Sequence, residues 1–404
     1  MTCAAFLSRL PESLSAAREA CEHLLTQFSG KSADLMCLFI SHHHAERLDE
    51  IVAYLSEKLG SRILIGCTGE TIIGGAEEIE SGPALSLWAA ELTGTKLVPF
   101  RVSFEETPDG MACLGLPDID EELKANASSI LLFGDPYTAD ARGVIDRFAE
   151  DLPGLPIVGG MASGSEGPGQ NRLILAVRGD AEQQSLADGI SKIYQEGAVG
   201  VILCGGPQLR TVVSQGCKPI GKPFVVTNAE RNLVFELGGL PPLQQLKLFF
   251  NELTPTDQAL VRQGLQLGIA MSEYREQFGM GDFLVSNVIG VDPEKGVIAI
   301  GNRIRVGQTV QFHVRDAQTA DEELRQLLER ERDRQSAAPQ GMLIFSCNGR
   351  GTRLFPQPHH DAHAVTSILG AVPLAGFFAQ GELGPVAGKN YIHGYTASIA
   401  LLDS

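Results

Sequence analysis

Residues 35–66 have the sequence LMCLFISHHHAERLDEIVAYLSEKLGSRILIG, and this stretch decides the class of fold. The apolar run at 35–40 predicts a buried strand, and a polar loop follows at 41–44. Apolar residues then recur at positions 48, 51, 52, 55 and 59, which is the spacing of one helical face. A short apolar run at 63–65, closed by Gly66, indicates a second strand. The stretch therefore predicts a βαβ unit.

A second segment matches the first without gaps at an offset of 93 residues. Its strand is expected at 130–133, its helix carries apolar residues at the same spacing, and its closing strand at 156–158 is followed by Gly159. The bland interpretation is that all βαβ units look alike. The identical spacing of five helix positions favours internal duplication of these two segments.

A third, looser copy lies near the C-terminus. A strand is expected at 343–345, a helix at 359–369 and a strand at 373–375, followed by Gly376. Between the copies, residues 197–238 and 283–301 contain strands and tight turns typical of antiparallel hairpins.

The predicted fold class is therefore α/β, with a mixed α+β second half. Repeated βαβ units would contribute to mixed sheets flanked by helices, in two tightly associated domains. We expect an amphipathic N-terminal helix within 1–30, a first domain at 31–225 and a second domain at 226–404.

Composition excludes several classes of function. The chain has 404 residues with 49 acidic and 32 basic side chains, a formal net charge of −17, which disfavours binding to nucleic acid or to anionic membranes. No apolar run is long enough to span a membrane, and the first residues do not resemble a signal peptide. The eight cysteines are scattered without a CxxC pair, which indicates reduced thiols in a cytoplasmic protein.

Several strings, in this order, resemble the FIST N and FIST C domains over roughly residues 30–395. They are LIGCTGE at 64–70, GAVGVILCGG followed by SQGCKPIGKPFVVT, VGQTVQFHVRDAQTADEEL, FSCNGRG at 345–351, PHHDAHAV and GFFAQGELGP at 376–385. The resemblance implies a sensory domain for small ligands such as amino acids. We find no output-domain motif, so we expect a signalling protein as partner or a homo-oligomer, and no cofactor.

The string SCNGRG predicts the core of a binding site. Two glycines, Gly349 and Gly351, let the backbone of Cys347 and Asn348 turn its N–H groups toward an anion. Arg350 could add a bidentate contact to a ligand carboxylate. The structural alternative is a turn in which Arg350 pairs with an acidic side chain, either Glu382 or Asp361.

A second part of the predicted site lies at Gly381 and Glu382, with His360 and Asp361 nearby. A glutamate at the end of a strand could hold a ligand's ammonium group, and with Arg350 it would recognise a zwitterion. The structural alternative is that Glu382 caps backbone N–H groups or pairs with Arg350.

Two competing functions use the same residues. In an enzyme, Cys347 would be a nucleophile with His360 as base and Asp361 orienting it, although neighbours on a helix rarely face one target. We expect a binding protein rather than this enzyme. His359 and His363 share a helical face and could hold a metal, yet the sequence offers no clear third ligand. A protein-interaction scaffold without a ligand is the last alternative.

Overall fold

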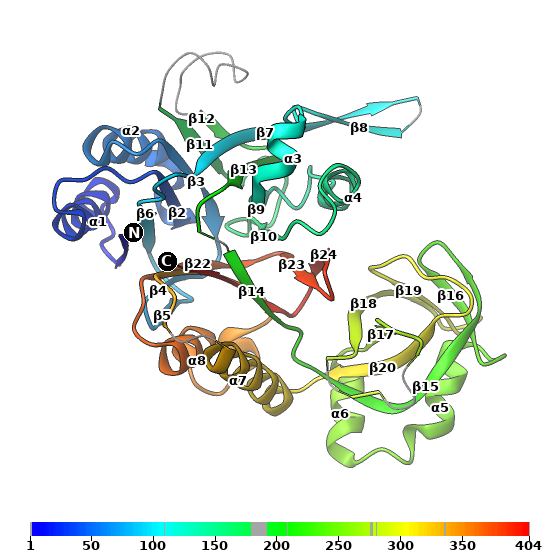
Figure 1. Cartoon of the computed structure of the whole chain (residues 1–404). Coiled ribbons are helices and arrows are strands. Elements are labelled where there is room, and N and C mark those ends of the chain that lie inside the picture. Colours follow the sequence, from blue (N-terminus) through cyan, green and yellow to red (C-terminus); the bar gives the residue numbers. More distant parts are fainter. Residues whose placement is uncertain are drawn as a thin grey trace. The chain divides into compact units, whose positions relative to one another are not determined.

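The structure is a computed structural model (Figure 1). It describes residues 2–108, 110–178, 192–207, 209–274, 278–279, 281–334 and 337–403. The chain forms two compact units, each assembled from separate segments. The larger unit comprises Met1–Val213, Arg325–Ile392 and Thr396–Ser404, and the smaller comprises Ser214–Leu324 and His393–Tyr395. We expected two domains that are each continuous in sequence, at 31–225 and 226–404, and this division stays a prediction.

All three βαβ units form where the sequence predicts them, and all lie in the larger unit. In each one the two strands are parallel neighbours. The first unit contains β2 (Leu35–Ser41), η1 (His42–Arg47), α2 (Leu48–Leu59) and β3 (Ile63–Gly69). The second contains β9 (Ala127–Gly134), α4 (Ala141–Asp151) and β10 (Ile157–Met161). The third contains β21 (Gly341–Cys347), η3 (Gly351–Arg353), α8 (His360–Leu369) and β22 (Leu374–Ala379).

Each parallel pair forms the middle of its own mixed sheet, which confirms the predicted α/β class. The first sheet has the order β1 (Cys3–Ser8), β6 (Leu85–Ala90), β2, β3, β11 (Leu173–Val177), β12 (Lys192–Tyr194). The second has the order β24 (Lys389–His393), β23 (Glu382–Val386), β10, β9, β13 (Ala198–Cys204), β7 (Lys96–Thr107), β8 (Gly110–Leu114). The third has the order β14 (Leu209–Ser214), β25 (Ala397–Leu402), β21, β22, β4 (Ile72–Gly74), β5 (Glu77–Ile79).

The three sheets exchange strands in a closed cycle. β4 follows β3 in the sequence but pairs with β22 of the third unit. β23 follows β22 but pairs with β10 of the second unit. β11 follows β10 but pairs with β3 of the first unit. The strand after each unit therefore joins the sheet of another unit. This exchange brings segments that are far apart in the sequence into one core.

Three phenylalanines occupy equivalent positions in the three units and pack against one another. Phe39 on β2, Phe133 on β9 and Phe345 on β21 are fully buried. Their ring centroids lie 5.4 to 6.1 Å apart in edge-to-face arrangements, a geometry that aromatic pairs favour. They sit in a core to which all three sheets contribute.

The glycine that follows each returning strand in the sequence pattern has a common structural role. A Cβ atom on Gly66, Gly159 or Gly376 would lie only 1.8 to 1.9 Å from a backbone carbonyl oxygen of the neighbouring parallel strand. Only glycine permits that approach. The first two units also differ by one residue in the length of chain between their paired strands. Gly66 pairs with Leu38, whereas Gly159 pairs with Leu132.

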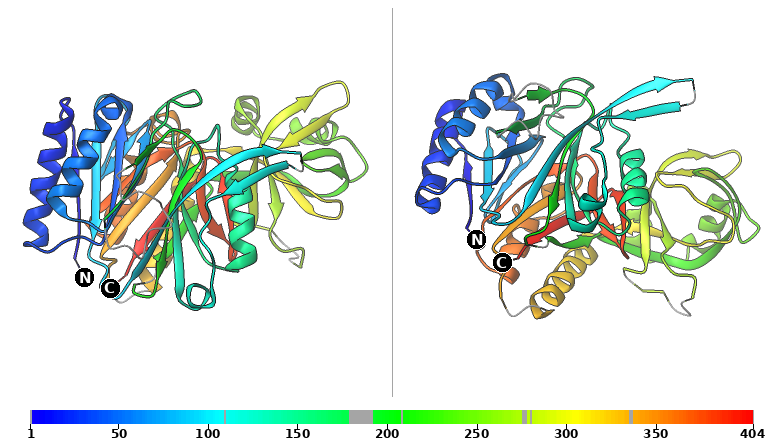
Figure 2. Two further views of the ribbon diagram at one scale, coloured as in Figure 1. Left: turned by 90° about the horizontal axis from the view of Figure 1, so that it is seen from above. Right: turned by 45° about the horizontal axis from the view of Figure 1, so that its top comes forward.

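Helices cover the outer faces of the sheets. α1 (Ser13–Phe28) and α2 pack side by side on one face of the first sheet, where they enclose a second apolar core (Figure 2). α4 covers the second sheet in the same way, with α3 (Glu121–Asn126) contributing Leu123. α1 lies within residues 1–30, where the sequence predicts an amphipathic helix.

One expected loop is partly a helix. His42 and His43 are exposed, as expected, but His44 is fully buried, and its Nδ1 lies 3.0 Å from the Ser13 hydroxyl. The polar loop predicted at 41–44 therefore contains one buried histidine, because the 3-10 turn of η1 places His44 against Ser13 of α1.

The smaller unit is a closed six-stranded barrel. Its strands, in barrel order, are β15 (Cys217–Glu230), β16 (Leu233–Leu237), β19 (Val297–Ile300), β18 (Phe283–Asp292), β17 (Gln266–Ala270) and β20 (Thr309–Arg315). Both predicted hairpins are present, β15–β16 and β18–β19. Its helices are α5 (Pro242–Phe250) and α6 (Pro255–Gln263), and α7 (Ala317–Arg334) begins in this unit and ends in the larger one. Among the described residues, no helix is long and apolar enough to cross a membrane.

Candidate functional site

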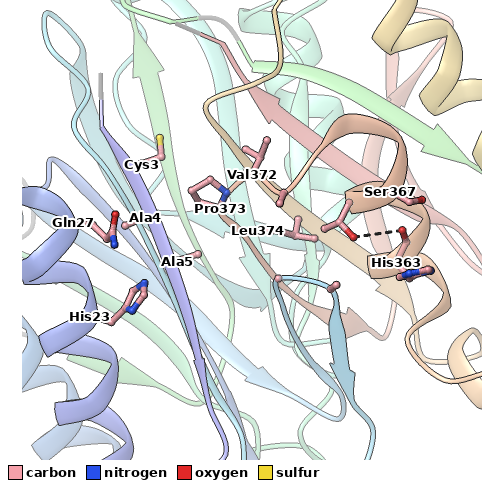
Figure 3. A pocket seen from close by; sticks show the side chains of 14 residues that line it. Cys3, Ala4, Ala5, His23, Gln27, His363, Ser367, Val372, Pro373 and Leu374 are labelled. Atoms are coloured by element: carbon pink, nitrogen blue, oxygen red, sulfur yellow. Dashed lines mark hydrogen bonds between the residues drawn. The ribbon is translucent and has the colours of Figure 1, made fainter.

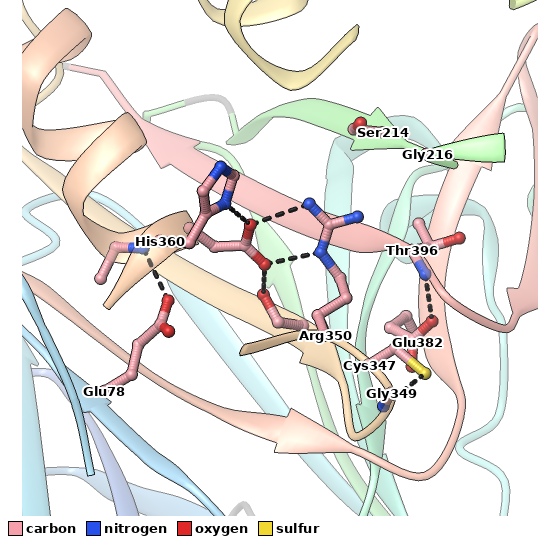
Figure 4. A network of polar contacts seen from close by, with 12 residues as sticks. Glu78, Ser214, Gly216, Cys347, Gly349, Arg350, His360, Glu382 and Thr396 are labelled. Atoms are coloured by element: carbon pink, nitrogen blue, oxygen red, sulfur yellow. Dashed lines mark hydrogen bonds and ion pairs between the residues drawn. The ribbon is translucent and has the colours of Figure 1, made fainter. Parts of the chain in front are cut away.

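The residues of the predicted site gather at the carboxyl ends of β21 and β22 (Figure 4). Cys347 is the last residue of β21, and a turn carries the chain through Arg350 into η3. Asp361 lies in the first turn of α8, and Glu382 is the first residue of β23. Ligands of open α/β sheets commonly bind at the carboxyl ends of their strands.

Arg350 and Asp361 form a fully buried, bidentate ion pair. Nε of Arg350 donates to Oδ2 of Asp361 at 2.6 Å, and Nη2 donates to Oδ1 at 2.8 Å. The Ser346 hydroxyl donates to the same carboxylate at 2.8 Å. Burial raises the pKa of Asp361, but the Arg350 charge and its hydrogen bonds outweigh this and hold the pKa well below its usual range. Of the two expected acidic partners for Arg350, Asp361 is the one it contacts bidentately.

His360 extends this pair toward the surface. Its Nδ1 lies 2.9 Å from Oδ1 of Asp361. Its ring stacks on Phe355, with centroids 3.4 Å apart and planes within 8°. The guanidinium of Arg350 lies 5.2 Å from the centre of the same Phe355 ring. The imidazole is therefore held in one orientation by a carboxylate and an aromatic face.

Glu382 is the second fully buried acid of the site. Its Oε2 accepts a hydrogen bond from the Thr396 backbone N–H at 3.1 Å. Among the described residues, its Oε1 is buried without a hydrogen-bond partner. Burial raises the pKa of Glu382 to about 8, against the lowering effects of hydrogen bonds from the Thr396 N–H, the Cys347 thiol and the Gly381 N–H and of the Arg350 charge. Part of the predicted capping role is thus present, and one carboxyl oxygen is left over.

Glu78 on β5 belongs to the same cluster, and the sequence did not point to it. Its Oε1 accepts from the Ala362 N–H at 2.9 Å, so it caps α8. Its own N–H donates to Nδ1 of His359 at 2.9 Å. Burial, followed by the charge of Asp361, raises its pKa to about 8. The cluster therefore contains three buried acids around one buried arginine.

The strand exchange shows that Glu382 is exceptional at its place in the scaffold. In each sheet, one residue of the exchanged strand lies opposite the residue that directly follows Gly66, Gly159 or Gly376. Ile72 lies opposite Phe377, Leu173 opposite Cys67, and Glu382 opposite Gly160. Two of the three equivalent positions are thus apolar core residues, so the fold itself does not require a carboxylate there.

The turn after β21 supplies the remaining predicted residues. The Gly349 N–H donates to Sγ of Cys347 at 3.4 Å, and Cys347 is half-buried. Oδ1 of Asn348 is buried and has no hydrogen-bond partner within the described part of the chain. Gly351 has a φ of +58°, and a Cβ there would clash with Phe378 and Glu80. Gly381 has a φ of +134° and precedes Glu382 directly.

The two metal candidates separate in the structure. His359 adopts a left-handed backbone conformation and directs its Nδ1 to the Glu78 N–H, so α8 begins at His360 rather than at His359. His363 is exposed and lines a surface groove. Over the residues that the structure describes, no group of three or more His, Cys, Asp or Glu side chains is arranged to hold a metal ion.

Comparison with known families gives a match along most of the chain. The FIST N domain matches residues 34–240 and the FIST C domain matches residues 246–385. The chain belongs to the FIST family. FIST domains are sensory domains of signal transduction.

Two proteins of similar length resemble this chain over nearly all of it. The uncharacterized protein Rv0628c of Mycobacterium tuberculosis is 39% identical over 396 residues, which are 98% of each chain. The uncharacterized protein Mb0898c of Mycobacterium bovis is 38% identical over 392 residues, 97% of this chain and 96% of the relative. The FIST match and these relatives cover the buried cluster, whose residues lie within the FIST C segment except for Glu78 in the FIST N segment.

Proposed function

We propose that this FIST protein is a sensory domain whose ligand is an amino acid or a related small carboxylate, bound at the cluster around Glu382. The contacting residues would be those of the predicted site: Cys347, Asn348, Gly349, Arg350, Gly351, His360, Asp361, Gly381 and Glu382. The proposal rests chiefly on one observation, the buried Oε1 of Glu382 that lacks a hydrogen-bond partner among the described residues.

A carboxyl oxygen in that situation favours a ligand that brings its own donor. A buried polar group without a partner costs free energy, on the order of 1–3 kcal/mol, which a ligand's N–H would recover. Two of three equivalent scaffold positions are apolar, so the cost at Glu382 is not a requirement of folding. An ammonium group would also favour the ionised form of this acid, whose pKa is raised to about 8.

In this proposal Arg350 does not make the bidentate contact to the ligand that the sequence suggested. Asp361 already occupies its Nε–Nη2 edge. Its charge would attract a ligand carboxylate, and its pairing keeps Asp361 and His360 in fixed positions. The buried Oδ1 of Asn348 is a second acceptor for a ligand donor.

A thermal-shift screen of the wild type and Glu382→Gln tests this function. The glutamine keeps an acceptor for the Thr396 N–H but removes the ionisable group. The screen compares amino acids, carboxylates without an amine and amines without a carboxylate. At 100 times its Kd, a ligand adds about 2.7 kcal/mol to the wild type. We expect an amino-acid response that the variant loses. A response to none of the three classes, or an equal response of both proteins, would count against the proposal.

A further inference from the structure

The smaller unit carries three arginines close together at one end of its barrel. Arg231 lies in the turn between β15 and β16, and Arg303 and Arg305 lie in the loop that follows β19. These strands are neighbours in the barrel (Figure 1). The Ile304 N–H donates to the Arg231 carbonyl at 2.8 Å, so Arg303 and Arg305 flank the residue that is bonded to Arg231. The three arginines therefore come from two loops that a hydrogen bond joins.

Further hydrogen bonds hold the two loops in place. The Ile300 N–H donates to the Asn232 carbonyl at 2.9 Å, and the Asn232 side chain donates to the Ile300 carbonyl at 3.1 Å. The loop after β19 also closes on itself, because the Arg305 N–H donates to the Gln308 side chain at 2.7 Å. The backbone positions of the three arginines are thus fixed by contacts within the smaller unit.

All three arginine side chains are exposed. Arg303 and Arg305 flank Ile304, whose side chain is buried, so both arginines project away from the barrel. Within the described part of the chain, none of the three guanidinium groups forms an ion pair. Glu273, an acid at the end of this loop, instead accepts hydrogen bonds from the Thr309 N–H and hydroxyl. A partner's carboxylates would therefore not have to displace an internal ion pair.

This end of the barrel is locally basic and partly apolar. Residues 230–233 and 301–308 contain the three arginines, no lysine and a single acid, Glu230, in a chain whose net charge is −17. Two apolar side chains next to the arginines are exposed, Leu233 at 37% and Val306 at 61%. Arginine is enriched at protein interfaces, whereas lysine and acidic residues are depleted there. The local composition therefore favours an interface.

The backbone of Arg231 is strained. Its φ is +55°, in the left-handed region that favours glycine. Hairpin turns of two residues usually place glycine, asparagine or aspartate at such a position. Residues held in disfavoured conformations cluster at functional sites. Arginine at this turn costs stability, and its side chain forms no compensating ion pair within the described chain, which favours a contact with a partner.

We propose that this surface, formed by Arg231, Arg303, Arg305, Leu233 and Val306, binds an acidic segment of a partner protein. Carboxylates of the segment would pair with the arginines, and an apolar side chain between them would contact Leu233 and Val306. Arginine clusters recognise acidic motifs in this way. Nucleic acid fits less well, because the net charge of the chain repels so dense a polyanion. The surface lies in the smaller unit and does not depend on the proposed ligand site.

Fluorescence anisotropy with short probes tests the proposal on the full chain at low salt. The probes are the rhodamine-labelled, amidated peptides EEVEEV, EESEES and KKVKKV, and a single-stranded oligothymidylate of similar length. We expect saturable binding of EEVEEV, about fivefold weaker binding of EESEES and no binding of KKVKKV. Tighter binding of the oligothymidylate than of EEVEEV would make nucleic acid the partner and overturn the proposal. No saturation of EEVEEV up to about 1 mM would also overturn it.

Protein variants locate the binding. Arg303→Glu with Arg305→Glu should weaken EEVEEV about tenfold, and Val306→Ser about threefold. Arg18→Glu with Arg330→Glu is the matched control, because it makes the same change of charge at two exposed arginines of the larger unit. This control should retain nearly all of the wild-type affinity. Wild-type affinity in the Arg303 and Arg305 variant would refute the surface.

Arg231→Gly separates binding from folding. Glycine relieves the left-handed backbone, so the melting temperature should rise while EEVEEV binds about threefold more weakly. Unchanged affinity would remove Arg231 from the surface. If the charge-reversed variant does not fold, Arg303→Gln with Arg305→Gln decides in its place. Ser367→Trp fills a groove of the larger unit whose described lining has no Asp, Glu, Lys or Arg (Figure 3), and it should leave binding unchanged.

Discussion

The first and third βαβ units carry the same scaffold and different chemistry. Phe39 and Phe345 occupy equivalent core positions, and the glycines at 66 and 376 allow the same close approach of strands. Two residues beyond each phenylalanine the units diverge, with Ser41 in one and Cys347 in the other. The first unit continues into a helical turn with a buried histidine, whereas the third continues into the buried Arg350–Asp361 pair. The repeated part of the sequence builds the fold, and the residues that break the repeat mark the candidate site.

The largest expected loss of stability follows from a change at Arg350, in the part of the third unit that breaks the repeat. Arg350→Ala leaves the buried Asp361 carboxylate without its charge partner, which typically costs about 3–5 kcal/mol. Urea unfolding measures the change. The double variant with Asp361→Asn should recover part of the loss. A single variant within about 0.5 kcal/mol of the wild type would show that the pair is not needed for stability.

A glycine substitution tests whether the scaffold is truly repeated. Gly66→Ala, Gly159→Ala and Gly376→Ala each place a methyl group within 2 Å of a carbonyl oxygen, so each should destabilise the protein by about 3 kcal/mol, the upper end of the usual cost of overpacking. Gly264→Ala is the matched control, since its nearest atom would be 3.8 Å away. Thermal unfolding of the four variants checks this. A mild effect at one of the three sites would break the equivalence.

A reciprocal exchange sharpens the comparison at Glu382 and Leu173. Glu382→Leu restores the apolar residue of the other two sheets, and its free energy of unfolding should stay within about 1.5 kcal/mol of the wild type. Leu173→Glu buries a carboxyl group in the apolar core, which should cost at least about 3 kcal/mol. Chemical denaturation compares them. Equal losses in both variants would mean that Glu382 is needed by the fold.

Stability should fall as the pH rises, because of the two acids with raised pKa values. Glu78 and Glu382 have a pKa of about 8 in the folded protein, against a usual value of 4.5. Between these values the unfolded chain releases their protons and the folded chain retains them, so unfolding becomes easier. We expect a decline of a few kcal/mol from pH 5 to 8. Glu78→Gln with Glu382→Gln should flatten this decline, and an unchanged slope would contradict the raised pKa values.

The smallest expected effect concerns the alternative enzyme. Binding by the site does not require a reactive thiol, so alkylation of Cys347 by iodoacetamide at pH 6 should be no faster than that of a free cysteine peptide. Mass spectrometry follows the modification. Selective and rapid alkylation at that pH would favour the nucleophile, with His360 or Glu382 as the proton acceptor.

The helical spacing and the terminal glycines were enough to predict the three βαβ units, because both are local properties of the sequence. The cyclic strand exchange could not be predicted, since β4, β11 and β23 have only three to five residues and pair with distant strands. The pairing of Arg350 with Asp361 was one of two alternatives, and only the position of α8 decided it. Glu78 was missed because the residue whose N–H it accepts, Ala362, lies 284 residues away.

The most direct test of the central claim is calorimetric titration of the best amino acid from the screen into the wild type, Glu382→Gln and Glu382→Leu. The account predicts measurable binding to the wild type and at least tenfold weaker binding to both variants, while both stay folded. Undiminished affinity in the two folded variants would contradict it, and would show that the buried carboxyl group of Glu382 does not receive the ligand.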